Sequence, residues 1–261
     1  MIPKKIHYCW FGGNPLPELA IKCIESWKKY CPDYEIIEWN ENNFDINYCE
    51  YVKEAYDAKK WAFVSDVARL YALVNYGGIY MDTDVEVLKS LDDILKYEAV
   101  SGFENEHSVL TGLMGCKKNQ ELFKELLHEY NDIHFVRKDG TYDTTTNVVR
   151  ITNICLKYGL KLNNSFQVVN GFALFPKDYF CPKDYVTKKI NLTKNTYTIH
   201  HFDGSWLSEE AKYTVDLTRK FSEILPKKMA NLMALFISRS KYHGIQKAIL
   251  DTSKFLKKSE R

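Results

Sequence analysis

The chain has 261 residues, of which 45% are hydrophobic and 27% charged, with a net charge of +2; this is the composition of a globular protein with one large domain, alone or with an extension. Its seven cysteines are an odd number without a CxxC pair, which argues against a disulfide framework or a zinc site and favours a reducing compartment. No apolar stretch reaches the ~18 residues of a membrane span, and Met1 leads into a strand pattern rather than a signal peptide.

The first part of the chain alternates strand and helix patterns. We predict a strand over residues 6–10, a helix over 16–30, a second strand over 34–39 and a short helical segment near 45–58. The loop after the first strand contains Gly12 and Gly13, and a nucleotide often docks at such a first loop. Trp10, at the start of this loop, either stacks on a base or packs in the core, and the sequence leaves both readings open.

Residues 62–86 predict a helix, a turn, a strand and then a pair of carboxylates. Apolar residues recur at helical spacing between residues 63 and 74, and Gly77 and Gly78 end the helix. After the short strand at residues 79–81, Asp82 and Asp84 are expected to point the same way, because alternate residues of an extended chain share a face. Such a pair at a strand end favours a hard divalent cation, with a solvated acidic turn as the alternative.

The following residues continue the alternation. We predict a short helix within residues 88–95 that is capped at Ser90, strands at 99–103, 166–169, 174–175 and 197–200, an apolar return at 110–116, and helices at 119–130 and about 147–158. A polar cluster at residues 143–147 opens the last of these helices. This alternation predicts an α/β fold with a mostly parallel sheet that is covered by helices.

The C-terminal residues differ in charge from the rest of the chain. Residues 211–261 hold 12 Lys and Arg against four Asp and Glu, a net charge of +8, so that residues 1–210 carry −6 of the total of +2. From residue 225 onward, apolar residues recur at helical spacing among the basic ones. We therefore predict a catalytic domain at 1–210 and a basic helical extension at 211–261.

Polar residues near these elements complete a candidate site. Asp66 and Arg69 are three residues apart on the predicted helix and so share a face, next to Ser65. His200 and His201 end the last predicted strand, and Ser205 and Trp206 follow them. Taken one at a time, the pair on the helix is more often a surface ion pair of small energetic worth, and two adjacent histidines are more often structural or solvated residues.

In combination, these features resemble family 32 of the glycosyltransferases, the sugar transferases with a DXD motif. This family includes bacterial capsule and lipooligosaccharide transferases and yeast initiating mannosyltransferases, and it is distantly similar to the clostridial glucosylating toxins. The matching segments, in chain order, are PKKIHYCWFGG at residues 3–13, AFVSD with Arg69 at 62–69, YGGIYMDTD at 76–84, and His200, His201, Ser205 and Trp206. The resemblance covers residues 2–206, and the ordered set of segments is what makes it specific.

The resemblance implies a GT-A fold, in which a Rossmann-like nucleotide-binding half merges with an acceptor half. It implies a retaining hexosyltransferase with a nucleotide-sugar donor, UDP-sugar favoured over GDP-sugar, and a divalent cation, Mn²⁺ before Mg²⁺. The acceptor is expected to be a glycan or lipid-linked saccharide of a surface polysaccharide such as a capsule. We expect no nucleic-acid partner and a cytoplasmic location, with peripheral attachment to the inner face of the membrane as an option.

Carried over to this sequence, the resemblance also implies metal ligands. Asp84 would ligate the metal, and Asp82 would do so directly or through water, or hold the ribose. His201 would be a further ligand, with His200 as its substitute. The imidazole favours manganese over magnesium.

The remaining residues would hold the donor. Asp66 and Arg69 would bind hydroxyls of the donor sugar next to Ser65, and with Asp82 and Asp84 they form the predicted catalytic set. Ser205 and Trp206 would contact the diphosphate, and Trp10 would lie near the base. Glu104 and Glu106 are candidates for a base or for acceptor contacts, because the sequence offers no clear enzymatic nucleophile.

Two other functions, and two roles for the C-terminal residues, stay open. A haloacid-dehalogenase-type phosphatase would use Asp82 as nucleophile, but its pattern wants Thr or Val where Glu86 stands. A non-catalytic carbohydrate-binding module would explain the aromatic residues, but not the carboxylate pair. Residues 225–261 either dock on an anionic membrane surface as an amphipathic basic helix or pack against the catalytic body.

Overall fold

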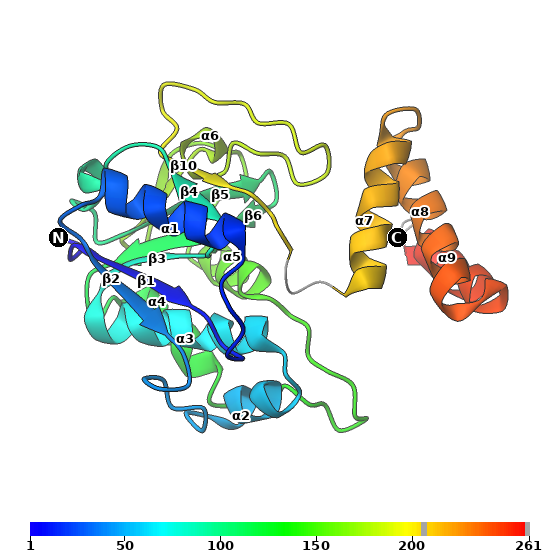
Figure 1. Ribbon diagram of the computed structural model, residues 1–261, viewed down its shortest axis with the longest axis horizontal. Helices are drawn as coiled ribbons and strands as arrows, with labels where there is room; N and C mark the ends of the chain where they lie inside the picture. Colours follow the sequence, from blue (N-terminus) through cyan, green and yellow to red (C-terminus); the bar gives the residue numbers. More distant parts are fainter. Residues whose placement is uncertain (205–207, 259–261) are drawn as a thin grey trace. The chain divides into compact units, whose positions relative to one another are not determined.

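A mixed β-sheet organises the first of the two units into which the chain divides (Figure 1). The computed structural model describes residues 1–204 and 208–258. The first unit comprises Met1–Lys183 and Ile190–His201, and the second comprises Asp184–Lys189 and Phe202–Arg261.

The sheet of the first unit has the order β2-β1-β3-β7-β5-β9-β8, with β6 paired to β5. Its strands are β1 (Lys5–Cys9), β2 (Glu35–Trp39), β3 (Gly78–Met81), β5 (Ala99–Asn105), β6 (Ser108–Val109), β7 (Leu113–Cys116), β8 (Gln167–Val169) and β9 (Phe172–Phe175). Strands β1, β2, β3, β5 and β9 run in one direction, whereas β7 is antiparallel between β3 and β5. The predicted α/β class and mostly parallel mixed sheet are confirmed.

Helices cover both faces of this sheet, as Figure 1 shows with α1 above it and α3 below it. The helices of the first unit are α1 (Glu18–Tyr30), α2 (Glu50–Asp57), α3 (Trp61–Tyr76), α4 (Glu121–Glu129), α5 (Asn147–Lys157) and α6 (Lys177–Phe180). The chain moves from β1 to β2 in one direction along the sheet and from β2 to β3 in the other. Because connections between parallel strands are right-handed, the helices of these two connections lie on opposite faces.

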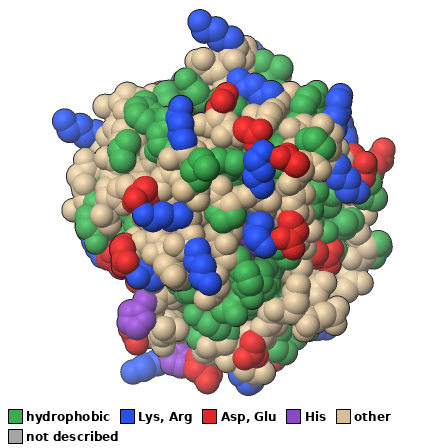
Figure 2. Space-filling model, turned by 90° about the vertical axis from the view of Figure 1, so that its left-hand side faces the viewer, with side chains coloured by type: hydrophobic (Ala, Val, Ile, Leu, Met, Phe, Trp, Pro, Cys, Tyr) green, Lys and Arg blue, Asp and Glu red, His purple; other side chains and the backbone are tan. Residues whose placement is uncertain are grey.

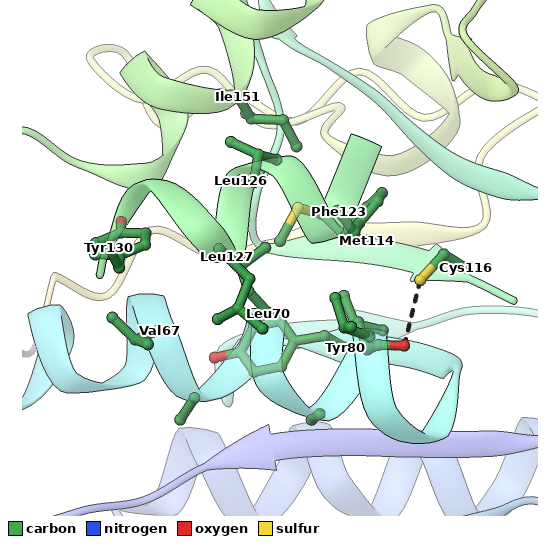
Figure 3. Packing of buried hydrophobic residues seen from close by; sticks show 14 of the residues in the cluster. Val67, Leu70, Tyr80, Met114, Cys116, Phe123, Leu126, Leu127, Tyr130 and Ile151 are labelled. Carbon is green, nitrogen blue, oxygen red and sulfur yellow. Dashed lines mark hydrogen bonds between the residues drawn. The ribbon is translucent and has the colours of Figure 1, made fainter. Parts of the chain in front are cut away.

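Helix α3 is buried on most of its surface, because it lies between the sheet and α4 (Figure 3). Val67 and Leu70 of α3 pack in one cluster with Leu127 and Tyr130 of the α4 segment. At the end of the helix, the Cys116 thiol donates to a backbone carbonyl of α3. Helix α3 is therefore fixed from both sides, and the polar residues that it carries are held rigidly.

The turn between α3 and β3 requires glycine. Gly77 has φ +65° and Gly78 has φ +112°, in the left-handed region that glycine adopts without strain. A Cβ on Gly78 would lie 2.8 Å from the carbonyl oxygen of Lys5. The predicted glycine stop is confirmed, and it sets the direction in which β3 leads to the carboxylates.

A buried histidine links β1 to this turn. The Nε2 atom of His7 lies 2.8 Å from the Gly77 carbonyl oxygen, and Nδ1 lies 3.1 Å from the indole nitrogen of Trp39. An indole N–H can only donate, so Nδ1 accepts and Nε2 carries the proton. Burial lowers the pKa of His7 to about 4, and the folded protein keeps this imidazole neutral.

This histidine predicts a loss of stability in mild acid. The pKa of His7 is lower in the folded state than in the unfolded state, where it is about 6.5. The unfolded chain therefore binds more protons between these values, and the free energy of unfolding falls by about 3 kcal/mol as the pH drops from 6.5 to 4. Denaturant titrations measure the free energy of unfolding of wild type and of His7→Gln. The difference between the two proteins should be about 2 kcal/mol smaller at pH 4.5 than at pH 7. A constant gap would contradict the buried neutral state.

Three short elements differ from the prediction. The helix expected within residues 88–95 is only a 3₁₀ turn at Asp92–Ile94. The strand β4 (Val85–Val87) and the short helix α6 were not predicted, because three or four residues show no periodicity. Strand β4 pairs antiparallel with β10 (Thr198–His200), in a small sheet of two strands among the described residues.

The second unit contains three helices within residues 208–258: α7 (Glu209–Ser222), α8 (Lys227–His243) and α9 (Ile245–Lys258). Small buried residues of α8, Ala230, Ala234 and Ser238, recur every four residues and allow close helix packing. The hydroxyl of Thr214 on α7 donates to that of Ser238 over 2.7 Å. None of the helices that the structure describes is both long and apolar enough to span a bilayer.

Charges of both signs are mixed on the face of the molecule in Figure 2. Lys and Arg side chains alternate there with Asp and Glu, and apolar side chains are spread between them. This face therefore presents an ordinary solvated surface rather than a field of one sign.

Candidate active site

The two aspartates lie in a turn between β3 and β4. The N–H of Asp82 donates to the Gly112 carbonyl over 2.8 Å, and the N–H of Val85 donates back to the Asp82 carbonyl over 3.0 Å. The predicted extended conformation of Asp82 and Asp84 is thus wrong, because the chain turns immediately after β3. The turn nevertheless keeps the two carboxylates close together.

A histidine completes a group of three potential metal ligands. One ligand atom each from Asp82, Asp84 and His200 lie within 4.8 Å of one another, and Nε2 of His200 is 3.3 Å from Oδ1 of Asp84. Two carboxylates and one imidazole are ligands that Mn²⁺ and related divalent ions accept. This donor set fits a bound divalent cation.

The charge state of His200 supports this fit. Burial lowers the pKa of His200, but the charge of Asp84 and its hydrogen bond outweigh burial and raise the pKa well above the ordinary value. The positive charge of the imidazolium then offsets part of the negative charge of the two carboxylates, as a bound cation between them would. Metal binding to this group must displace that proton, because only neutral imidazole is a ligand.

Gly112 leaves room for the cluster. A Cβ on Gly112 would lie 2.9 Å from Cε1 of His200 and 3.2 Å from Oδ2 of Asp82. Carbon atoms do not normally approach that closely, so any larger residue would push the ligands apart. The sequence analysis missed Gly112, whose only signal was a glycine ahead of the apolar segment that forms β7.

We expect Gly112→Ala to weaken metal affinity by about tenfold without unfolding the protein. The added methyl group would shift His200 or Asp82 by a few tenths of an ångström, and misplaced ligands bind a metal less tightly. Titration of Mn²⁺ by calorimetry should show this loss, and thermal melting should show that the variant is folded. Unchanged Mn²⁺ affinity would show that the cluster tolerates the methyl group.

The neighbouring histidine lies with a different partner. Nε2 of His201 is 2.8 Å from Oε2 of Glu86, and the Lys22 ammonium lies 3.4 Å from the same carboxylate oxygen. Successive residues of a strand face opposite sides, so His200 and His201 separate at the end of β10. The structure thus brings the substitute ligand, His200, to the two carboxylates.

A buried arginine joins the cluster to α3. The Arg69 guanidinium lies 3.2 Å from Oδ1 of Asp66 and 3.3 Å from Oδ1 of Asp82. It also donates to the carbonyls of Thr111 and Ser65. Such a planar fork suits two carboxylates at once. Arg69 therefore couples the predicted sugar-binding residues to the predicted metal ligands.

Tyr80 supports the same arrangement from β3. The guanidinium of Arg69 lies 4.5 Å from the centroid of the Tyr80 ring, and the Tyr80 hydroxyl donates to Oδ1 of Asp82 over 2.9 Å. The orientation of Asp82 is thus fixed by two donors. Tyr80 was predicted only as a strand residue, because its contact with Arg69 depends on the packing of α3 on the sheet.

Asp66 is held in a buried position. Burial raises the pKa of Asp66 to about 6, although the charge of Arg69 acts in the opposite direction. The carboxylate is ionised at neutral pH, and its other oxygen accepts from the backbone N–H of Asn147 over 3.2 Å. This partner lies 81 residues away, and the sequence analysis did not identify it.

The other predicted residues occupy the same sheet edge or lie outside the described part. Trp10 follows β1, which is parallel to β3, and its indole N–H donates to the Asn14 carbonyl. Glu104 lies near the end of β5, where burial raises its pKa and Ser108 donates to it over 3.3 Å. Glu106 is exposed. Ser205 and Trp206 lie outside the described residues.

Comparison with known proteins identifies the region that contains α3 and the two aspartates. Residues 17–101 match the family model described as "Glycosyltransferase sugar-binding region containing DXD motif". The resemblance that we predicted from the sequence is confirmed over this region. The first and last predicted segments, at residues 3–13 and 200–206, lie outside the matched range.

Individual relatives agree with this match. The chain is 29% identical over 130 residues to inositol phosphoceramide mannosyltransferase 3 of Schizosaccharomyces pombe, covering 48% of this chain and 36% of the relative. It is 30% identical over 153 residues to an uncharacterized glycosyltransferase, L373, of Acanthamoeba polyphaga mimivirus, covering 51% and 58%. The chain thus spans about one third to three fifths of these relatives.

A solved structure with similarity to this chain is a glycosyltransferase involved in the glycosylation of the major capsid of PBCV-1. The two share 14% sequence identity with a TM-score of 0.44, over 77% of this chain and 94% of that one.

Proposed function

We propose that this protein is a metal-dependent glycosyltransferase that moves a sugar from a nucleotide sugar to a saccharide acceptor. The observation that carries the proposal is the cluster of Asp82, Asp84 and His200 at the carboxyl ends of the strands, where α/β sheets bind their ligands. The match of residues 17–101 to a sugar-binding region with a DXD motif supports it.

The three clustered residues would hold the cation, for which Mn²⁺ is our first choice. When bound, the cation would act as a Lewis acid that stabilises the charge developing on the leaving diphosphate. Tyr80 and Arg69 keep Asp82 oriented for this role through the contacts of 2.9 and 3.3 Å. Gly112 keeps the space that the ligands need.

Asp66 and Arg69 would orient the donor sugar. Their side chains are nearly buried, and they are fixed by neighbours on both sides, so little entropy is lost when they bind hydroxyls. As the sugar–phosphate bond breaks, the ring acquires oxocarbenium character, and hydrogen bonds from fixed partners hold it in place. Trp10, Ser205 and Trp206 would contact the nucleotide, as the family resemblance implies.

We propose retention of the anomeric configuration on the same resemblance. Glu104 lies near the end of β5, which runs in the direction of β3, and both strands therefore end at the edge where the metal would bind. It is our candidate for contact with the acceptor hydroxyl. Product analysis by NMR distinguishes an α-linked from a β-linked product and so tests retention directly.

Turnover of sugar nucleotides tests the proposed function. A panel of UDP-sugars and GDP-mannose should be hydrolysed slowly with Mn²⁺ present and not in EDTA; GDP-mannose is included because a matched relative is named a mannosyltransferase. Preferential hydrolysis of p-nitrophenyl phosphate would indicate a phosphatase. Sugar binding without any turnover would indicate a carbohydrate-binding module. For the acceptor we propose a lipid-linked or free saccharide of a surface polysaccharide.

The second unit suits a peripheral position on an anionic membrane, which we propose at the cytoplasmic face. Ile245 and Ile249, one turn apart on α9, are 62% and 58% exposed, and Lys247 stands between them in the sequence. On α8, Met229 and Met233 are exposed at the same spacing. Apolar side chains among lysines favour the interface of an anionic bilayer.

Vesicle sedimentation tests this docking. At low salt, full-length protein should bind vesicles with about 30% anionic lipid. The double variant Ile245→Ser with Ile249→Ser should bind about thirtyfold more weakly, since each exposed isoleucine contributes about 1 kcal/mol. Ile21→Ser on α1, at a site of 50% exposure, is the matched control. Equal binding of all three proteins, or binding insensitive to salt, would contradict the proposal.

A further inference from the structure

The N-terminus of α5 makes a buried connection to Asp66. Asn147, the first residue of α5, donates its backbone N–H to Oδ2 of Asp66 over 3.2 Å. Its side-chain amide donates to the backbone carbonyl of Asp66 over 2.7 Å. Asn147 and Asp66 are 2% and 8% exposed. Two hydrogen bonds therefore join the start of α5 to one residue of α3.

The side chain of Asn147 is itself held at its other end. The hydroxyl of Tyr130 donates to Oδ1 of Asn147 over 2.6 Å, and Tyr130 is fully buried. Both ends of the Asn147 amide are thus used within the protein. The side chain is oriented by its neighbours rather than available to a ligand.

The segment that leads into α5 is also fixed. The carboxylate of Asp143 accepts from the backbone N–H and the hydroxyl of Thr145 and pairs with Arg150 over 2.7 Å. Arg150 belongs to α5, so this ion pair ties the loop to its own helix. The N–H of Asn147 therefore reaches Asp66 from a rigid support.

Asp66 needs such support because it shares Arg69 with a second carboxylate. One guanidinium serves both Asp66 and Asp82, at 3.2 and 3.3 Å. A carboxylate that lost its second donor would turn further toward Arg69 and draw it away from Asp82. The position of Asp66 is thus linked to that of a proposed metal ligand.

We propose that Asn147 is a positioning residue, which holds the Asp66 carboxylate in the orientation that the donor sugar requires. The inference rests on the proposed function, because it assigns a role within the same site. Asn147 acts through Asp66 and does not touch the substrate. It also couples α5 and the segment before it to the donor side of the site.

Three variants separate positioning from simple stability. Asn147→Ala removes the side-chain bonds and keeps the N–H. Asn147→Pro also removes the N–H. Residue 147 is the first helical position, where proline is tolerated, and the preceding Thr146 has φ −80° and ψ 162°, the extended conformation that suits a following proline. Tyr130→Phe removes a bond of equal burial at the far end of the same side chain.

We expect the turnover number for sugar-nucleotide hydrolysis to fall about tenfold in Asn147→Ala and about 100-fold in Asn147→Pro. Tyr130→Phe should change it by less than about threefold, although it destabilises the protein comparably. The Kd for UDP or GDP with Mn²⁺ should be unchanged in all three. Equal losses of turnover in Asn147→Ala and Tyr130→Phe, or losses that only follow the folded fraction, would overturn the inference. The comparison of these two variants is sufficient for the test even when Asn147→Pro does not fold.

A second readout does not depend on activity. Carboxyl ¹³C NMR titration of Asp66 should show a higher pKa in the Asn147 variants that fold, because a lost donor favours the protonated form, and an unchanged pKa in Tyr130→Phe. The charged groups that face Asp66 are Arg69, Asp82 and Arg150, and all remain. Absence of sugar-nucleotide hydrolysis by wild type would contradict the proposed function. An Asp66 pKa that is the same in wild type and in the Asn147 variants would separately overturn the positioning role.

Discussion

Replacing Asp84 by Asn should lower metal-dependent turnover by about 10³-fold while the protein stays folded. The carboxylate lies in the cluster with Asp82 and His200, and an amide is a neutral and weaker ligand. Without the cation, charge on the leaving diphosphate would be unstabilised, which accounts for a loss of about 4 kcal/mol in transition-state stabilisation. Steady-state rates across an Mn²⁺ titration measure this loss, and thermal melting checks the fold.

Controls for this prediction come from three other positions. Asp57→Asn, at an exposed ion pair with Lys53, should leave turnover unchanged. His200→Ala should weaken Mn²⁺ affinity at least tenfold, whereas His201→Ala should not, since His201 lies with Glu86. The reverse result would restore His201 as the ligand. Full activity of Asp84→Asn in EDTA would show that the cluster is not a metal site.

Replacing Arg69 by Met should destabilise the protein by about 3–5 kcal/mol and reduce turnover more than nucleotide affinity. The Arg69 side chain is 7% exposed and pairs with Asp66 and Asp82. Its loss therefore leaves the nearly buried carboxylate of Asp66 and the half-buried carboxylate of Asp82 without their shared cation. The donor sugar would lose its oriented partners, whereas the nucleotide contacts would remain. Denaturant titration, turnover and calorimetry with UDP or GDP measure the three quantities.

The matched control for this change is Arg137→Met. Arg137 pairs with Asp143 over 3.1 Å, but its side chain is 52% exposed, so that its loss should cost less than about 1 kcal/mol. Adding Asp66→Asn to Arg69→Met should recover part of the lost stability, because one uncompensated charge is removed. An equal drop in nucleotide affinity and turnover in Arg69→Met would instead identify a structural ion pair.

The sequence by itself determined the elements whose signals are local. The periodicity of residues 63–74, Gly77 and Gly78, and the aspartate pair predicted α3, its turn, β3 and the carboxylates in the right order. Each of these depends on neighbours within a few residues, where spacing and backbone preferences act directly. The likeness to sugar transferases rests on the same local segments, and the family model matches that region.

Tertiary structure decided which of these residues meet. Pairing of β4 with β10 selects His200 rather than His201 for the carboxylates, because the alternation of a strand has no defined inner face until its partner is known. The contact of Asp66 with Asn147 joins residues 81 apart, and the space at Gly112 is filled by His200 from a distant segment. Such contacts arise from packing, which a linear pattern does not encode.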